Sequence, residues 1–414
     1  MTPFIPIPIP MNPPSPSSGW RVALAGLGIN LALGVLYTWS LFKGAIEKDF
    51  GWKGDQLNDP YALCCLVFAF AMIAAGRCQD RLGPRLTATI GGLLVAAGFV
   101  LISTTRDYAL WVLGFGVLTG LGIGFGYSSA TPPALKWFPP AKTGLIAGLV
   151  VAGFGLAPVY LAPLSDYLLR HFGLLHSMLV LGVAFAVIVC GLAQFLVNPP
   201  DGHLPSASGG AATASGNELS PGEILRTGQF WLLWILYFIG AGAGLMVISS
   251  IGGMAKKSMG EAAFVAVAVM AVGNAGGRIA AGILSDRIGR RFTLLLVLLL
   301  QAVLMFVSIP LTSKSGCTAL LIVLAATAIG FNYGANLSLF PSLTKDLWGL
   351  RNFGVNYGCL FTAWGVGGFV LSRLQQMLKA SSGGFTSSFA TAGILLVAGA
   401  FLSLLIPAPR KSVG

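Results

Sequence analysis

The sequence predicts an all-α polytopic membrane protein with twelve transmembrane helices in two six-helix halves. Of its 414 residues, 55% are hydrophobic and 9% are charged, whereas a soluble domain carries about 25% charged residues. Apolar runs of roughly 20 residues, long enough to cross the hydrocarbon layer as a helix, recur along the chain. A β-barrel would instead show short strands of alternating polarity. A charged segment after the second run is repeated after the eighth, which indicates internal duplication.

A proline-rich tail is expected first, over residues 1–19. Pro6, Pro8 and Pro10 alternate with isoleucine, a pattern that favours extended polyproline II. The tail has neither a basic start nor a small-residue cleavage site, so it does not resemble a signal peptide. We expect it to be disordered, with the first apolar run acting as the insertion signal.

The N-terminal half is expected over residues 20–198. Its six apolar runs are 20–42, 58–78, 86–104, 108–135, 143–165 and 175–197. Glycine is frequent in the fourth and fifth runs, where it lets helices approach closely. Pro158 and Pro163 add bending points because proline lacks an amide donor. These features suit helices that rock against one another, although a static bundle would also use them.

A cytoplasmic linker over residues 199–227 is expected to join the halves. Its proline, serine and glycine content is typical of linkers. The segment Ser220-Pro221-Gly222-Glu223 predicts a short interfacial helix, because serine at the N-cap and glutamate three residues later satisfy free backbone N–H groups.

The C-terminal half is expected over residues 228–408, followed by a tail at 409–414. Its six apolar runs are 228–250, 261–284, 292–312, 316–341, 352–374 and 385–407. Basic residues are more frequent on the side that carries both termini, which predicts cytoplasmic termini in the cell inner (plasma) membrane. The net charge of +12 fits this topology and a lipid environment better than a nucleic-acid partner.

No residue pattern indicates a cofactor, a metal site or an enzyme. The six cysteines have no ligand spacing and are expected to be free. The three histidines, His171, His176 and His203, are scattered. Neither a nucleotide-binding loop nor a set of catalytic side chains occurs within the runs.

The duplicated segment keeps glycine, Asp-Arg and Gly-x-Arg at identical offsets, which allows the halves to be compared position by position. The charged residues of its two copies are Asp80, Arg81 and Arg85, and Asp286, Arg287 and Arg291. Aspartate and arginine side chains near helix ends can form a breakable latch between the halves. The alternative interpretation is a topology signal alone.

This organisation resembles the major facilitator superfamily, in which Gly-x-x-x-Asp-Arg-x-Gly-x-Arg stands between spans 2 and 3 and spans 8 and 9. The first copy departs from the pattern at Pro84, where a basic residue is usual. The segments GVLYTW at 34–39, KWFP at 136–139 and LRTGQFWLLW at 225–234 resemble the oxalate:formate antiporters and monocarboxylate transporters. The resemblance implies the major facilitator fold and a bacterial homologue that moves lactate or pyruvate with a proton.

Arg278 is the principal site candidate because it lies well inside an apolar span. A buried charge costs several kcal/mol unless it faces a cavity or a partner, and no acidic residue lies in the middle of any span. An anionic substrate would supply the counter-charge, and a guanidinium can hold a carboxylate through two parallel hydrogen bonds. Snorkelling to the interface, or pairing with Asp286, remains the alternative.

Asn274 precedes Arg278 by four residues and shares its helix face. Monocarboxylate transporters commonly carry an aspartate there, implicated in proton coupling, and their span-1 lysine corresponds to Leu41. In the antiporters a second lysine stands where this chain has Trp364. The resemblance therefore leaves the proton route open, and one intramembrane cation suits a monocarboxylate better than oxalate.

The other pocket candidates are polar or aromatic residues of spans that line the superfamily's cavity. They are Asn30 and Tyr37 in span 1, Tyr127 in span 4, Tyr333 and Asn336 in span 10, and Tyr357, Phe361 and Trp364 in span 11. Each could instead serve packing or the membrane interface.

The sequence thus predicts a secondary active transporter of small monocarboxylates such as L-lactate or pyruvate, coupled to a proton and working by alternating access. Two alternatives stay open: an organic-anion exchanger of the oxalate:formate type, and a membrane anion sensor that does not transport. Nothing in the predicted mechanism requires an oligomer.

Overall fold

The computed structural model describes residues 16–200, 218–259, 263–313, 319–382 and 386–407, and within these ranges the chain is helical apart from short connections. Most of the predicted tails and residues 201–217 of the linker lie outside them. The described part contains eleven helices long and apolar enough to cross a membrane. One of these spans two predicted runs, since α7 (Thr143–Ala193) bends at Gly173, whose φ of 72° and ψ of 175° are not helical. The predicted all-α membrane fold is confirmed.

The first part of the chain contains two irregular spans. Its elements are α1 (Pro16–Leu33), η1 (Gly34–Thr38), α2 (Trp39–Phe50), α3 (Asp55–Leu82), α4 (Pro84–Ser103), α5 (Tyr108–Trp111), η2 (Val112–Thr119), α6 (Gly120–Trp137), η3 (Pro140–Lys142) and α7. A 3-10 segment, η1, interrupts the first predicted span, and a π-helical segment, η2, interrupts the fourth. Each changes the helix face that the following residues present.

The second part begins with the predicted short helix. Its elements are α8 (Pro221–Ile224), α9 (Gly228–Met259), α10 (Ala263–Ile288), α11 (Arg290–Ser313), α12 (Ala319–Trp348), α13 (Phe353–Ser382) and α14 (Thr386–Ser403). The capping box of α8 is formed, with the Ser220 backbone N–H donating to Glu223 Oε2 at 2.6 Å. The hydrogen bonds from Ser220 hold the pKa of Glu223 below its ordinary value.

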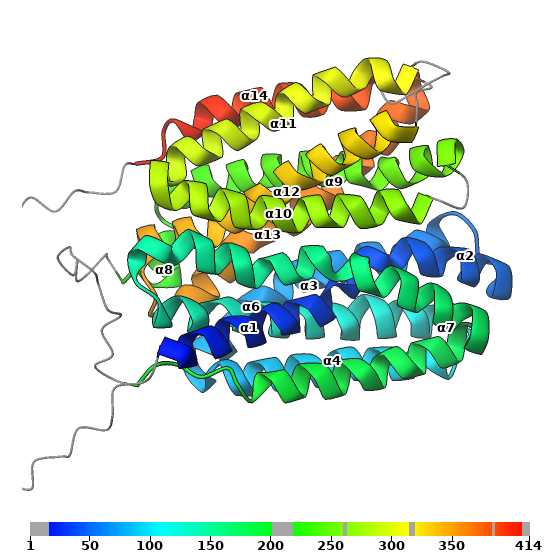
Figure 1. The fold of residues 1–414 in the computed structure, drawn as a ribbon, viewed down its shortest axis with the longest axis horizontal. Coiled ribbons are helices and arrows are strands. Elements are labelled where there is room, and N and C mark those ends of the chain that lie inside the picture. Colours follow the sequence, from blue (N-terminus) through cyan, green and yellow to red (C-terminus); the bar gives the residue numbers. More distant parts are fainter. Residues whose placement is uncertain (1–15, 201–217, 260–262, 314–318, 383–385, 408–414) are drawn as a thin grey trace, which may run out of the picture.

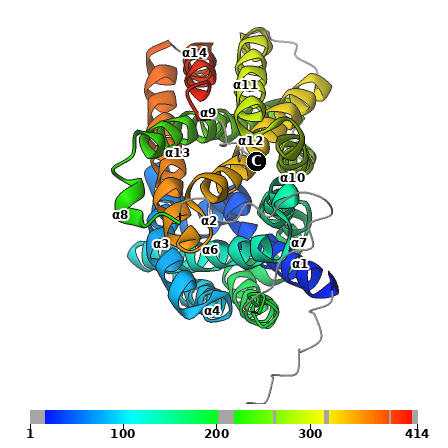
Figure 2. The ribbon, with the colours of Figure 1, turned by 90° about the vertical axis from the view of Figure 1, so that its left-hand side faces the viewer.

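The long helices run side by side, with α1 to α7 forming one group and α9 to α14 the other (Figure 1). Helix α8, the start of α1 and the end of α14 lie at one end of the bundle, here called the α8 end, and α2 lies at the opposite, α2 end (Figure 1). Seen from the α8 end, the groups meet where α3 packs on α13 and α7 packs on α10 (Figure 2). Large apolar side chains such as Leu93, Val187 and Phe401 are exposed on the outside of the bundle, as lipid contact requires.

Candidate functional site

Arg278 is fully buried in α10, on the face toward α7. Its Nε donates to Asn274 Oδ1 at 2.9 Å, and its Nη1 donates to the Val151 carbonyl of α7 at 2.5 Å. Its Nη2 has no hydrogen-bond partner. Asp286 pairs with Arg290 at 2.7 Å instead, and no ion pair between described residues includes Arg278. The guanidinium is thus a buried cation with a free donor and no carboxylate partner among the described residues.

The guanidinium faces a small aromatic chamber of about 10 Å³. The residues that line this chamber are Tyr37, Phe68, Tyr127, Phe154, Arg278, Leu337, Phe361 and Trp364. Ring centroids lie 5.4 Å apart for Tyr127 and Phe361, and 5.2 Å apart for Phe361 and Trp364. Five of the predicted site residues are therefore brought together, and the chamber must widen before it admits more than about one water molecule.

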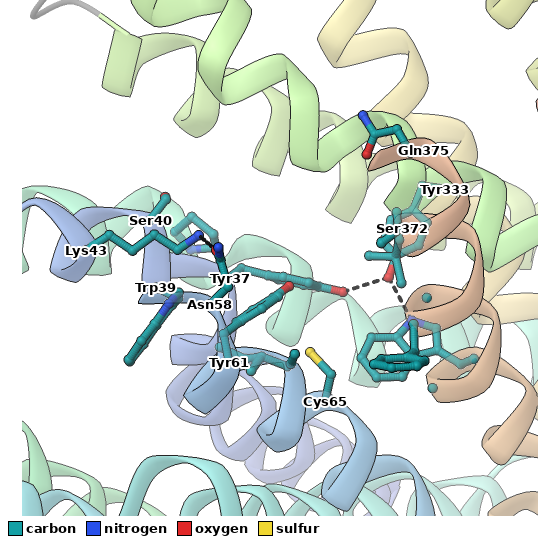
Figure 3. Close-up of a pocket in the computed structure, with 18 of the residues that line it drawn as sticks. Tyr37, Trp39, Ser40, Lys43, Asn58, Tyr61, Cys65, Tyr333, Ser372 and Gln375 are labelled. Carbon is teal, nitrogen blue, oxygen red and sulfur yellow. Dashed lines mark hydrogen bonds between the residues drawn. The ribbon is translucent and has the colours of Figure 1, made fainter. Parts of the chain in front are cut away.

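A larger cavity of about 310 Å³ lies between this chamber and the α2 end. Its deep wall includes Asn274, Tyr333, Tyr37 and Trp364. Exposed or half-buried polar side chains in its lining include Ser40, Lys43, Asn58 and Ser372 (Figure 3). Asp59 and Arg373 also belong to this lining. We refer to these six residues as the mouth of the cavity. The volume is within the range of small-molecule sites. We call it the outer cavity.

The sequence did not indicate the polar residues at the mouth. Lys43 donates to Asn58 Oδ1 at 2.5 Å, and Asp59 accepts a hydrogen bond from the Tyr108 hydroxyl at 2.7 Å. Lys43 follows the first predicted apolar run, 20–42, whereas α2 continues as a helix to Phe50 and keeps the Lys43 side chain on the cavity wall. The sequence could have indicated Lys43 only through its position after Tyr37 on the same continuing helix, in a segment that also contains other charged residues.

Three predicted pocket residues lie outside the lining of both cavities. Asn30 donates to the Val150 carbonyl at 2.9 Å and ties α1 to α7. Asn336 donates to Gln301 Oε1 of α11 at 2.8 Å. Tyr357 is buried beside Phe361, one layer behind the chamber. For Asn30 the reason is η1, because its tighter winding separates the face of Asn30 from that of Tyr37.

The two aspartates of the duplicated segment contact helix N-termini in the opposite half. Asp80 at the end of α3 accepts from the backbone N–H groups of Gly354 and Val355 in α13, at 3.0 and 2.9 Å. Asp286 at the end of α10 accepts from those of Gly144 and Leu145 in α7, at 2.8 and 2.9 Å. A carboxylate on a helix N-terminus is stabilised by free N–H donors and by the helix dipole. Both contacts lie at the α8 end, and we call them the α3–α13 and α10–α7 latches.

The arginines of the segment take different positions. Arg81, Arg85 and Arg287 are exposed and form no ion pair with a described residue. Arg291 lies over the Phe292 ring at 5.9 Å. Arg290 was not among the predicted latch residues. It binds Asp286 at 2.7 Å and Asp346 at 2.9 Å, and it stands where the first copy has Pro84.

Comparisons with known proteins agree with this architecture. Residues 22–372 match the family model of the Major Facilitator Superfamily. The oxalate:formate antiporter of Oxalobacter formigenes is 28% identical over 402 residues, which cover 95% of this chain and 92% of that protein. Human monocarboxylate transporter 11 is 27% identical over 417 residues, covering 98% and 87%.

A solved structure shows the same fold. The outward conformation of FucP superposes with a TM-score of 0.70 and 15% identity, covering 94% of this chain and 100% of that one. With the family match across most of its length, this chain belongs to the Major Facilitator Superfamily.

Proposed function

We propose that this chain is a secondary active transporter of small monocarboxylates such as L-lactate or pyruvate. The observation that carries the proposal is Arg278, a fully buried guanidinium with a free Nη2 and no carboxylate partner among the described residues. A buried cation is stabilised when an anion binds beside it and neutralises its charge. A planar carboxylate fits the guanidinium through two parallel hydrogen bonds.

The surroundings of Arg278 favour one carboxylate rather than two. The rest of the chamber wall is aromatic or aliphatic, so a second carboxylate would enter it without a cation. The methyl group of lactate or pyruvate suits the rings of Phe68 and Phe361. The names of the relatives, an oxalate:formate antiporter and a monocarboxylate transporter, support small organic anions as the substrate class.

The two ends of the bundle support the proposal of alternating access. The latches hold the halves together at the α8 end, while the outer cavity reaches the surface at the α2 end. We propose that the α8 end, with both termini, is cytoplasmic in the inner membrane. The substrate would then enter through the outer cavity and leave after the latches open.

Proton coupling requires a group that carries the proton across the membrane with the substrate. Asn274 cannot titrate and so cannot accept the proton. Asp166, the acidic residue directly after the predicted run 143–165, forms an exposed ion pair with Arg170 at 2.9 Å and lines neither cavity. We propose that the substrate carboxylate itself takes part in the proton transfer, accepting the proton only as it leaves Arg278, because the guanidinium stabilises the ionised form. Exchange of organic anions without protons is the second candidate, and it is favoured by the carboxamide of Asn274 beside the cation.

Uptake into liposomes tests the proposal. Purified protein is reconstituted, and radiolabelled L-lactate uptake is measured with and without an inward proton gradient. Gradient-stimulated uptake supports symport, and uptake that needs internal lactate but no gradient supports exchange. The same assay is repeated with radiolabelled pyruvate and formate, and absence of flux for all three anions would refute the monocarboxylate assignment.

Two substitutions of Arg278 test whether its guanidinium binds the anion. Arg278→Gln is expected to abolish saturable lactate binding, and Arg278→Lys to weaken it at least tenfold because an ammonium lacks the paired donors. Arg170→Gln, which removes an arginine from an exposed ion pair, serves as the control. Affinity for lactate in Arg278→Gln equal to that of the parent protein would show that another group binds the anion.

A further inference from the structure

A chain of hydrogen bonds crosses between the halves at the deep wall of the outer cavity (Figure 3). The hydroxyls of Tyr37 and Tyr333 lie 3.0 Å apart, and Trp364 Nε1 donates to the Tyr333 hydroxyl at 2.8 Å. Tyr37 belongs to η1 in the N-terminal half, whereas Tyr333 belongs to α12 and Trp364 to α13 in the other half. The hydrogen bond between Tyr37 and Tyr333 can therefore form only while the two halves are in contact at the level of these residues.

The same residues separate the outer cavity from the chamber of Arg278. Tyr37 and Trp364 line both spaces, Tyr333 lines the outer cavity, and Arg278 lines only the chamber. Arg278 has no exposed surface. An anion in the outer cavity must displace the Tyr37–Tyr333 pair before it reaches the guanidinium.

The geometry of the Tyr37–Tyr333 pair allows either hydroxyl to donate, and the burial of Tyr333 favours one order of the hydrogen bonds. The Tyr333 oxygen already accepts from Trp364, and Tyr333 is fully buried, so its own proton needs an acceptor within the protein. The Tyr37 oxygen is the acceptor within reach. Tyr37 is only half-buried, so its proton is left to point toward the outer cavity. The order of donors is Trp364 to Tyr333, Tyr333 to Tyr37, and Tyr37 to the cavity.

We propose that Tyr37, Tyr333 and Trp364 form an outer gate that selects hydrogen-bond acceptors and opens when an anion replaces the tyrosine pair. A carboxylate accepts the Tyr37 proton and then the free Nη2 donor of Arg278. A group that cannot accept a hydrogen bond leaves the Tyr37 proton unpaired at the gate. For the identity of the anion, this inference rests on the proposed function; the gate itself does not.

Cysteine accessibility tests the gate without any transport measurement. All six native cysteines are replaced, Leu337→Cys is introduced in the chamber, and Ser372→Cys is introduced in the outer cavity as a reference. The membrane-impermeant thiol reagent MTSET is added from the α2 end without substrate. If Leu337→Cys does not accumulate, Phe361→Cys replaces it, since Phe361 also lines the chamber.

Two hydroxyl deletions are compared in this background. Tyr333→Phe removes the inter-half hydrogen bond and is expected to speed chamber labelling roughly two- to tenfold, the range for one neutral hydrogen bond, with Ser372→Cys unchanged. Tyr160→Phe is the matched control because its hydroxyl bonds to the Leu31 carbonyl within the N-terminal half. Equal chamber labelling rates in the parent, Tyr160→Phe and Tyr333→Phe backgrounds would overturn the gate.

Substrate protection tests the order of donors. Tyr37→Phe opens the gate and also removes the proton that meets the anion, so lactate should protect the chamber cysteine less well than it does in Tyr333→Phe. Equal protection in both variants would refute the donor order. Failure of lactate, pyruvate, formate and oxalate alike to protect, with the labelling difference intact, would leave the gate standing and refute the assignment of the substrate.

Discussion

Replacing Asp80 with asparagine should release the α8 end of the bundle. The Asp80 carboxylate accepts from two backbone N–H groups at the start of α13 and forms no ion pair with a described residue. Asparagine keeps one acceptor oxygen but loses the charge. A hydrogen bond to a charged group contributes about 1.5–3 kcal/mol, and the charge on a helix N-terminus about 0.3–1 kcal/mol. We expect a loss of about 2 kcal/mol from the state that is closed at this end.

A change of about 2 kcal/mol alters the ratio of the two conformations about 30-fold. A closed-to-open ratio of about 30 to 1 would fall to about 1 to 1. Spin labels on Leu86 and Ile288, exposed at the α8 end in opposite halves, report the change as a longer interspin distance in lipid nanodiscs. A second pair, on Lys48 and Gln376, should move closer together at the α2 end.

The control variant is Asp107→Asn. Asp107 also caps a helix N-terminus, accepting from the Leu110 backbone N–H at 3.0 Å, but both residues belong to the N-terminal half. It should leave both distance distributions unchanged. If Asp80→Asn likewise leaves the Leu86–Ile288 distribution unchanged, the latch does not hold the halves together and the reasoning fails.

Further substitutions test the close contact at Gly282 beside the α10–α7 latch, the anion site at Arg278 and the packing of α1 on α7. In Gly282→Ala the new Cβ would lie 2.2 Å from the Gly144 carbonyl oxygen, so the same spin-label assay should show opening at the α8 end, whereas Gly191→Ala, with no atom within 4 Å of its Cβ, should not. Asn274→Asp puts a carboxylate beside Arg278 Nε, where the guanidinium keeps it ionised, so lactate affinity in the uptake assay should fall about tenfold or more at neutral and mildly acidic pH alike. Asn30→Ala loses its bond to Val150 and should cost about 1 kcal/mol, seen as a lower unfolding midpoint in detergent with an unchanged KM for lactate.

The fold and the centre of the site were predictable because they depend on local properties of the sequence. Runs of apolar residues long enough for a membrane helix fix the fold class, and a cation such as Arg278 within a run is conspicuous because its burial is costly. Asn274 follows from helix periodicity alone. These inferences need no knowledge of how the helices pack.

The contacts between the halves were not predictable, because their acceptors and donors are far apart in the sequence. Asp80 bonds to backbone N–H groups 274 and 275 residues away, and backbone groups carry no sequence signal. Asn30 was assigned to the pocket on the assumption of a continuous α-helix, which η1 breaks. Lys43 was missed because charged residues near a span end are typical of loops.

Helix α13 connects the gate and the α3–α13 latch mechanically. Val355, which binds Asp80, and Trp364, which orients Tyr333, lie on this helix nine residues apart, or roughly 13 Å along its axis. A helix of this length moves largely as a rigid body. When its N-terminus leaves Asp80, Trp364 is displaced as well, so opening at the α8 end and the hydrogen bonding of the gate cannot change independently.

The asymmetry of the latches indicates where that motion begins. Asp286 keeps an ion pair to Arg290, which also binds Asp346, whereas the equivalent of Arg290 in the first copy is Pro84, which can donate no hydrogen bond. These ion pairs lie within the C-terminal half, but Lys345 of α12 also donates to Thr143 Oγ1 of α7 at 2.6 Å, which adds a bond between the halves beside the α10–α7 latch. The α3–α13 latch therefore has fewer inter-half contacts to break, and it acts on the helix that carries Trp364. Opening should start at Asp80, with α7 and α10 as the pivot. This order predicts that Asp80→Asn lengthens the Leu86–Ile288 distance more than Asp346→Asn, which weakens only the support of the α10–α7 latch.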